Sequence, residues 1–220
     1  MQLTALQSVS RVRGFSLVEA AVVLVVIGII LGAVLQGRSL IESAEYKSFR
    51  QQIREHRGAF HNFRDRFNAL PGDFENANAQ LGAPDPDASN GGNGLIDDGP
   101  DCTGATDESC LAWQHLRFAG MLGGNPEDSG EDAPPAHPFG GEVRSFFTGD
   151  EGNGEFGHKL LITNVPIGIA VRLDRDEDNE LCGSGRVTLR EVTGGATCAN
   201  SDEDWPSEPG GGTVDIVYAL

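Results

Sequence analysis

The sequence predicts an α+β protein in which a long N-terminal helix, with a membrane half and an amphipathic half, packs on a small antiparallel sheet with long loops. Three observations lead to this prediction. One long apolar run lies near the N-terminus, aromatic residues follow it at helical spacing, and short strand-like segments fill the last third of the chain. Helix and strands are segregated along the sequence, which is the pattern of an α+β fold.

The apolar run covers residues 15–35, and only Ser16 and Glu19 interrupt its 21 residues. As a helix it extends roughly 30 Å, the thickness of the hydrocarbon core of a bilayer. A cleaved secretory signal has a shorter apolar core that ends in small residues at a cleavage site, which this run lacks. An uncleaved signal anchor fits the length equally well. We therefore expect residues 15–37 to be a transmembrane helix.

Glu19 is the unusual residue of this run. A carboxylate inside a membrane segment costs a few kcal/mol at the centre of the bilayer and less near its surface. The rest of the run contains no lysine, arginine or histidine that could neutralise it. The partner of Glu19 must therefore come from outside the segment.

Residues 11–19, RVRGFSLVE, resemble the processing site of type IV prepilins and of the pseudopilins of type II secretion. In that family a short basic leader ends in glycine, a phenylalanine follows, and a glutamate stands at the fifth mature position. The resemblance implies that a prepilin peptidase removes residues 1–14 by cutting between Gly14 and Phe15, and then methylates the new amine. It also implies that Glu19 pairs with the terminal amine of a neighbouring subunit, which sets the register between subunits.

The function implied by this resemblance is that of a structural subunit of a type IV pilus-like filament, assembled through its N-terminal helix. A pseudopilin of type II secretion is the alternative within the same class. A membrane-anchored adhesion or binding module, using loops at residues 82–106 or 123–141, is the alternative from another class. The expected location is the bacterial inner membrane with the head in the periplasm, and then the filament. The expected partners are prepilin peptidase, other pilin-like subunits and the inner membrane.

Residues 38–70 are predicted to continue the helix in amphipathic form, because aromatic and aliphatic residues recur at steps of three and four. Proline first occurs after this stretch, at Pro71, where Pro71-Gly72 ends the helix. The stripe is expected to pack on the head. It consists of Tyr46, Phe49, Ile53, His56, Phe60, Phe63, Phe67 and Leu70.

The head, residues 71–220, is strongly acidic. It contains 28 acidic and seven basic residues, a net charge of −21, against −17 for the whole chain. This charge repels a phosphate backbone, so no nucleic acid is expected as a partner. Close packing of such heads in a filament is also unfavourable unless the charge is screened or the subunit is rare, which favours a minor pilin.

Within the head we expect one short helix over Glu108–Leu122, ended by Gly123-Gly124. Alternating apolar residues predict the strands of a small antiparallel sheet. These strands are Val143–Phe147, Lys159–Thr163, a segment from Ile167 to Asp174, Arg186–Thr193 and Thr213–Leu220.

The four cysteines, Cys102, Cys110, Cys182 and Cys198, all lie in the head. An even number suits disulfides outside the cytoplasm. Three pairings are possible, and the local one, Cys102 with Cys110 and Cys182 with Cys198, is preferred. Their spacing does not fit a zinc site.

Asp174, Asp176 and Asp178 occupy alternating positions, as the first ligands of a calcium-binding loop do. Gly185 stands where such a loop needs its closing glutamate, so the match covers half a loop. The sequence therefore leaves open a calcium site at these aspartates or an acidic, solvated hairpin.

The sequence does not predict an enzyme. The five histidines are scattered, and neither a G-x-S-x-G nor an H-E-x-x-H motif occurs. Paired carboxylates carry no information in a chain with this many acidic residues.

Overall fold

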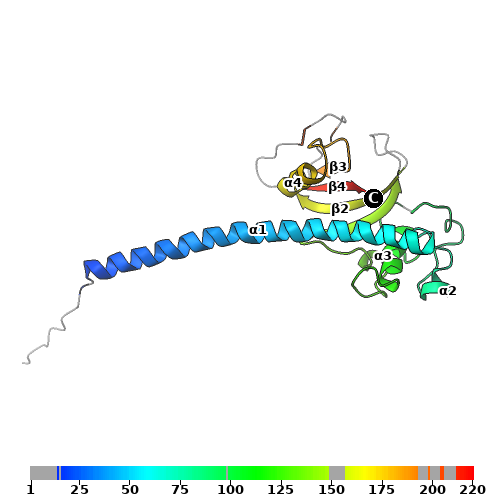
Figure 1. Cartoon of the computed structure of the whole chain (residues 1–220), viewed down its shortest axis with the longest axis horizontal. Helices are drawn as coiled ribbons and strands as arrows, with labels where there is room; N and C mark the ends of the chain where they lie inside the picture. Colours follow the sequence, from blue (N-terminus) through cyan, green and yellow to red (C-terminus); the bar gives the residue numbers. More distant parts are fainter. Residues whose placement is uncertain are drawn as a thin grey trace, which may run out of the picture. The chain divides into compact units, whose positions relative to one another are not determined.

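The computed structural model describes residues 14, 16–97, 99–148, 157–192, 198, 204–205 and 212–220 (Figure 1). The chain divides into two compact units, Met1–Ala44 and Glu45–Leu220. Its elements are α1 (Leu17–Phe67), α2 (Ala77–Leu81), α3 (Glu108–Phe118), a 3₁₀ turn (Gly130–Asp132), β1 (Val143–Thr148), β2 (Gly157–Pro166), α4 (Ile167–Glu177), β3 (Val187–Val192) and β4 (Thr213–Ala219). The predicted α+β layout, a long N-terminal helix and a small sheet, is confirmed.

The sheet has four antiparallel strands in the order β1-β2-β4-β3. Its two faces follow the two-residue period of a strand. On β2, Leu160 and Ile162 belong to the main core, whereas Leu161 between them joins Phe146 and Val217 in a small cluster of its own. Four of the predicted strand segments therefore form the sheet, each within a few residues of its predicted ends.

The fifth predicted strand was wrong, because the segment from Ile167 to Asp174 lies in helix α4. The spacing of its apolar residues fits both the two-residue period of a strand and the turn of a helix. Ile167, Ile169 and Leu173 alternate as in a strand, but Ile167, Ala170 and Asp174 also lie one helical turn apart, and all five are buried. Pro166 at the N-cap starts the helix after β2. Packing of this buried face therefore overrides the alternation.

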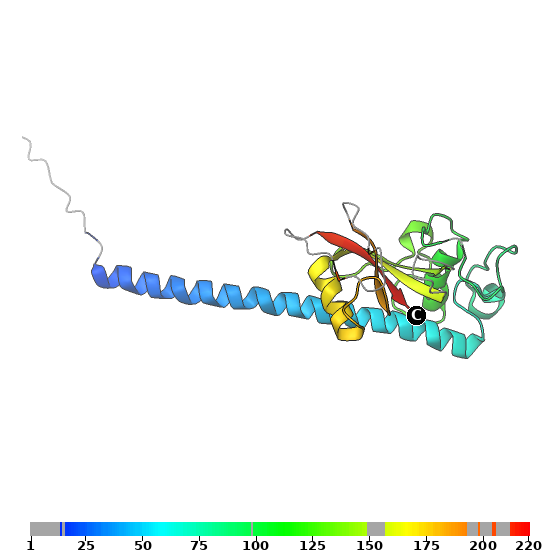
Figure 2. The same cartoon turned by 90° about the horizontal axis from the view of Figure 1, so that it is seen from above.

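The aromatic stripe of α1 packs on the head as predicted, with Tyr46, Phe49, Ile53, His56, Phe60 and Phe63 all buried. Tyr46 donates a hydrogen bond to Asp176 of α4 (2.7 Å), whereas Phe60 lies edge-on to Trp113 of α3, with ring centroids 5.6 Å apart. Within this unit α4 and α3 thus meet the stripe at different points along the helix (Figure 1, Figure 2).

Helix α1 ends at Phe67, three residues before the predicted Leu70, because Asn68 adopts a left-handed conformation (φ 50°). The predicted turn at Pro71-Gly72 follows. Gly72 has φ 95°, and a Cβ there would overlap the carbonyl oxygen of Glu108. Only glycine therefore fits this turn.

The side chain of His115 on α3 is hydrogen-bonded to this turn. Its Nδ1 accepts a hydrogen bond from the Gly72 amide (3.0 Å), and its Nε2 lies 2.8 Å from the carbonyl oxygen of Pro84. This geometry requires the neutral tautomer with the proton on Nε2. Burial, opposed by the Pro84 contact, lowers the pKa of His115 to about 4.

Helix α3 begins at Glu108 as predicted but ends at Phe118, before Gly123-Gly124. Gly120 is left-handed (φ 68°), and its amide bonds the carbonyl of Arg117, while the Met121 amide bonds that of Leu116. These two bonds form a Schellman motif. The helix therefore stops at the first glycine that can adopt this conformation.

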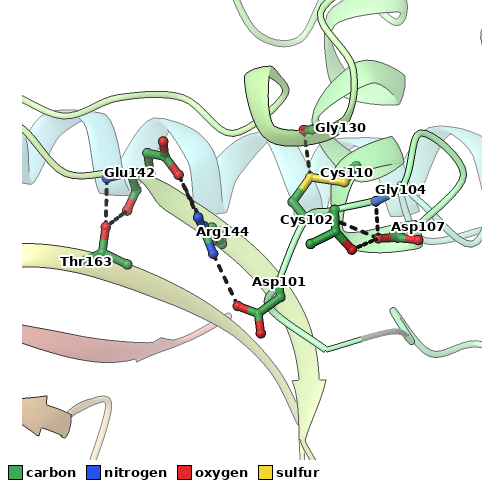
Figure 3. Close-up of polar contacts among 10 residues, drawn as sticks. Asp101, Cys102, Gly104, Asp107, Cys110, Gly130, Glu142, Arg144 and Thr163 are labelled. Atoms are coloured by element: carbon green, nitrogen blue, oxygen red, sulfur yellow. Dashed lines mark hydrogen bonds and ion pairs between the residues drawn. A yellow bond between two sulfur atoms is a disulfide. The ribbon is translucent and has the colours of Figure 1, made fainter.

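The structure pairs Cys102 with Cys110 and Cys182 with Cys198, the local pairing preferred from the sequence. Figure 3 shows the first bridge beside the start of α3, where Asp107 accepts hydrogen bonds from the amides of Thr103 and Gly104. On neighbouring β1, Arg144 forms ion pairs with Glu142 (3.1 Å) and Asp101 (3.3 Å). The bridge and these bonds tie the loop before α3 to the sheet.

Candidate processing and assembly segment

The predicted processing junction is only partly described. Gly14 is exposed, and Ser16 directly precedes the first turn of α1. Phe15 and the leader residues 1–13 lie outside the described residues. Cleavage between Gly14 and Phe15 and methylation of the new amine therefore stay predictions.

Ser16 and Glu19 cap the start of α1 together. The Ser16 amide donates to Oε2 of Glu19 (3.4 Å), and the Val18 amide donates to Oγ of Ser16 (3.3 Å). This is the arrangement of a capping box, except that the hydroxyl bonds the amide of the second helical residue and not the third, and it satisfies amides that the first helical turn leaves without partners. The carboxylate also lies at the positive end of the helix dipole.

Sequence reasoning gave Glu19 a partner only in another subunit and missed this local role. The signal was present, because Ser-x-x-Glu ahead of an apolar run is the sequence signature of a capping box. Both hydrogen bonds are long and exposed. In the described part of the chain no cation forms an ion pair with Glu19, so its charge is available to a second group.

The apolar side chains that follow Glu19 are exposed around the whole helix. Leu24 is 69% exposed and Leu35 is 68% exposed, and the most apolar 18-residue window has a mean hydropathy of 2.8 with none of it buried. Within the described residues α1 is the one helix long and apolar enough to cross a membrane. A helix that is apolar on all sides is stable only when lipid or other apolar helices surround it.

The prokaryotic N-terminal methylation motif, the signature of type IV pilins and pseudopilins, matches residues 9–35. The N-terminal segment of the chain therefore carries the type IV pilin and pseudopilin signature. The match includes the expected cleavage junction, Glu19 and the apolar run, and it ends before the head begins. No curated protein and no solved structure matches the chain. The similarity to known proteins is thus confined to the N-terminal segment, and any role of the head has to be argued from its own structure.

The three aspartates proposed as calcium ligands do not converge in the structure. Asp174 is buried and accepts a hydrogen bond from Nε1 of Trp205 (2.5 Å), and burial raises the pKa of its carboxyl group. Asp178 accepts hydrogen bonds from the backbone amides of Arg186 and Val187. Asp176 accepts hydrogen bonds from Tyr46 and Arg50 of helix α1.

Among the described residues there is no group of three histidine, cysteine, aspartate or glutamate side chains that could hold a metal ion. Asp174 and Asp178 stand one helical turn apart, and Asp176 lies between them on another side of the chain. Calcium binding by the three together stays a prediction, and their separate hydrogen bonds argue against it.

Asp176 and its neighbour Glu177 instead link α4 to α1. Arg50 pairs with both (3.2 and 2.5 Å), and Arg54 pairs with Glu177 (2.6 Å). Burial raises the pKa of Glu177, but the hydrogen bonds and charges of the two arginines outweigh it and leave the pKa below its usual value. Burial and the bond to Asp176 raise the pKa of Tyr46. The acidic run after Leu173 is thus part of the contact between helix and head.

Proposed function

We propose that the protein is a minor pilin. In this proposal the chain enters the inner membrane through α1, prepilin peptidase cleaves it between Gly14 and Phe15, and the mature subunit joins a filament through α1 with its head outward. The observation that carries the proposal is the apolar part of α1, which is exposed on every side and begins with the methylation motif. Such a surface needs lipid first and like helices afterwards.

The capping box supports a two-stage role for Glu19. In the membrane, the Ser16 amide and the helix dipole lower the cost of the carboxylate. During assembly the amine at the start of a neighbouring mature chain replaces this weak contact with a charge-assisted hydrogen bond. A methylated amine still carries its charge and can make this bond. The pairing would fix the axial register of subunits that are otherwise held by non-directional apolar contacts.

The charge of the head favours a minor subunit over a major one. Close packing of heads that each carry −21 creates repulsion, and screening by salt reduces it only for charges further apart than about 10 Å. A low copy number avoids this repulsion. A pseudopilin of type II secretion has the same N-terminal segment, and deletion of secretion or of pilus genes would separate the two roles. The motif indicates a structural subunit, and no catalytic role is proposed.

The role of Glu19 is tested with Glu19→Ala in cells that assemble the filament. We expect the variant to insert into the membrane and to be processed, but its incorporation into filaments should fall at least tenfold, because a lost charge-assisted contact is worth about 1.5–3 kcal/mol. Glu42→Ala is the matched control, since Glu42 is an exposed glutamate of the same helix beyond the apolar run. Immunoblots of sheared filaments and of membranes measure both steps. Equal incorporation of the two variants would contradict the proposed role.

A further inference from the structure

A cleft of about 640 Å³ lies in the second compact unit, Glu45–Leu220, at the C-terminal end of α1. Its walls come from three separate segments: residues 64–80, the glycine-rich loop at residues 92–94, and His158 at the start of β2. The volume falls within the range of small-molecule sites, about 300 to 1,000 Å³. The cleft is remote in sequence from the methylation motif, and the pilin-like role of α1 does not use it.

Two aromatic rings line the cleft. Phe74 is 6% exposed, Phe67 is half-buried, and their ring centroids lie 5.5 Å apart. Phe63 packs behind both rings and keeps them in place, at 4.6 Å from Phe67 and 5.9 Å from Phe74. Phe74 is almost completely covered, and Arg66 lies 5.0 Å from the centroid of the Phe67 ring, so the apolar wall open to a ligand is the remaining exposed part of Phe67.

The rim carries planar polar side chains. Arg64, Asn68, Asn76 and Gln80 are all exposed and line the cleft. In the part of the chain that the structure describes, none of these four side chains has a hydrogen-bond partner. Each amide offers donors and an acceptor side by side, and the guanidinium offers several donors. Such groups bind a ligand that presents many neighbouring hydroxyl groups.

Two further polar groups lie deeper in the cleft wall. Asp73 is 3% exposed, and its two oxygens accept hydrogen bonds from the amides of Asn93 (3.0 Å) and Gly94 (2.8 Å), while the Gly92 amide also interacts with this carboxylate. Nε2 of His158 is buried and lacks a hydrogen-bond partner among the described residues. A buried polar atom without a partner is unfavourable, so a ligand that bonds to it gains affinity.

The charges of the lining exclude other classes of ligand. Arg64 is opposed by the carboxylates of Asp73 and Glu75, so a phosphate or another strongly anionic group is not favoured. A lipid chain would leave the amides of the rim without partners. We propose that this cleft binds a neutral saccharide, with one sugar ring against the exposed part of Phe67 and its hydroxyl groups bonded to Asn76 and Gln80.

The test uses the full chain in a detergent without a sugar headgroup and three neutral disaccharide probes, N,N′-diacetylchitobiose, maltose and lactose. Saturation-transfer NMR and calorimetry measure binding. We expect at least one probe to bind with a Kd below about 1 mM. Asn76→Ala and Gln80→Ala should each weaken that binding roughly fivefold, because each removes a neutral hydrogen bond.

Asn78→Ala is the matched control, because Asn78 is exposed on the same short helix but does not line the cleft. It should leave the Kd unchanged. Both rim residues are exposed, so thermal unfolding of all three variants should match that of the wild type. The proposal is overturned if none of the probes binds at about 10 mM, or if Asn78→Ala weakens binding as much as Gln80→Ala does. Neither result bears on filament assembly, which is measured separately.

Discussion

The two parts of α1 place similar apolar side chains in opposite surroundings. In the part up to Ala44, large side chains such as Leu24 and Leu35 are more than 60% exposed, whereas in the part from Glu45 on Phe49 and Phe63 are fully buried. Backbone geometry is helical throughout. The difference lies in the pattern: the first part is apolar on all sides, and the second part is apolar on one stripe and charged elsewhere.

This comparison shows what each part needs. The second part is stabilised by the head of its own chain, so its function is to hold the head. The first part finds no protein surface within its own unit, so it depends on lipid or on other apolar helices. Changes in the first part should therefore alter membrane insertion, and changes in the second part should alter the stability of the head.

The largest expected effect is a loss of stability of the head in acid. Burial lowers the pKa of His56 and of His115 to about 4 from about 6.5, so the unfolded chain binds protons more tightly than the folded one. Their contribution is complete above pH 6.5 and is lost as the pH falls from about 6.5 to about 4. The loss is on the order of 3 kcal/mol for each histidine. The apolar part of α1 has no histidine and should not contribute.

Buried carboxyls contribute to the pH dependence with the opposite sign, since burial raises the pKa values of Asp73 and Asp174. The informative quantity is therefore the difference between the wild type and His56→Phe, in which the carboxyl contributions cancel. His56 lies edge-on to Trp113, with no partner for its ring nitrogens among the described residues, so phenylalanine can replace it. Urea unfolding at pH 7 and pH 4.5 should show the variant gaining relative to the wild type in acid. A constant difference would refute the assignment.

Phe49→Ala should destabilise the head by about 3–5 kcal/mol, because it removes a fully buried ring that contacts His137 and Phe139 at about 5 Å. Membrane association should not change. Ser48→Ala, an exposed neighbour on the same helix, is the control. Urea unfolding of the full chain in detergent measures the first effect and membrane fractionation the second. A loss below about 1 kcal/mol would mean that the stripe does not hold the head.

Val25→Lys should impair membrane insertion and leave the stability of the head unchanged, and its free-energy effect should be the smallest of these three. A lysine in the middle of a membrane helix costs about 2.5–3.5 kcal/mol, so the membrane-inserted fraction should fall. The unfolding midpoint of the head should stay at the wild-type value. Ser39→Lys, just beyond the apolar run, should insert normally. If Val25→Lys lowered the stability of the head instead, the separation between the two parts of α1 would be wrong.

Much of this architecture could be predicted because it depends on local patterns. The aromatic stripe follows helical spacing over seven turns, the four strand segments are short elements separated by loops rich in glycine, proline and aspartate, and the cysteines close short loops. Segment 167–174 could not be assigned, because its apolar residues fit both a strand and a helix, and only packing on the sheet and on Tyr46 decides between them.

Among the candidate sites, too, those that depend on a local sequence pattern could be predicted and those that depend on folding could not. The methylation motif is contiguous and could be recognised from nine residues, and the capping box of Ser16 and Glu19 was readable from their spacing. The three aspartates suggested a calcium-binding loop, but Asp174 and Asp176 lie in helix α4, and calcium binding there stays a prediction. The cleft could not be foreseen, since Phe67, Gly92 and His158 meet only in the folded head.

The most direct test of the pilin-like role is mass spectrometry of the N-terminus of the mature protein, purified from membranes of cells with and without active prepilin peptidase. Cells with the peptidase should yield a chain that begins at Phe15 and carries one methyl group on its amine, and cells without it should yield the uncleaved chain. An intact Met1 in both strains, or a terminus near Gly37, would contradict the assignment of α1 as the processed helix of a filament subunit.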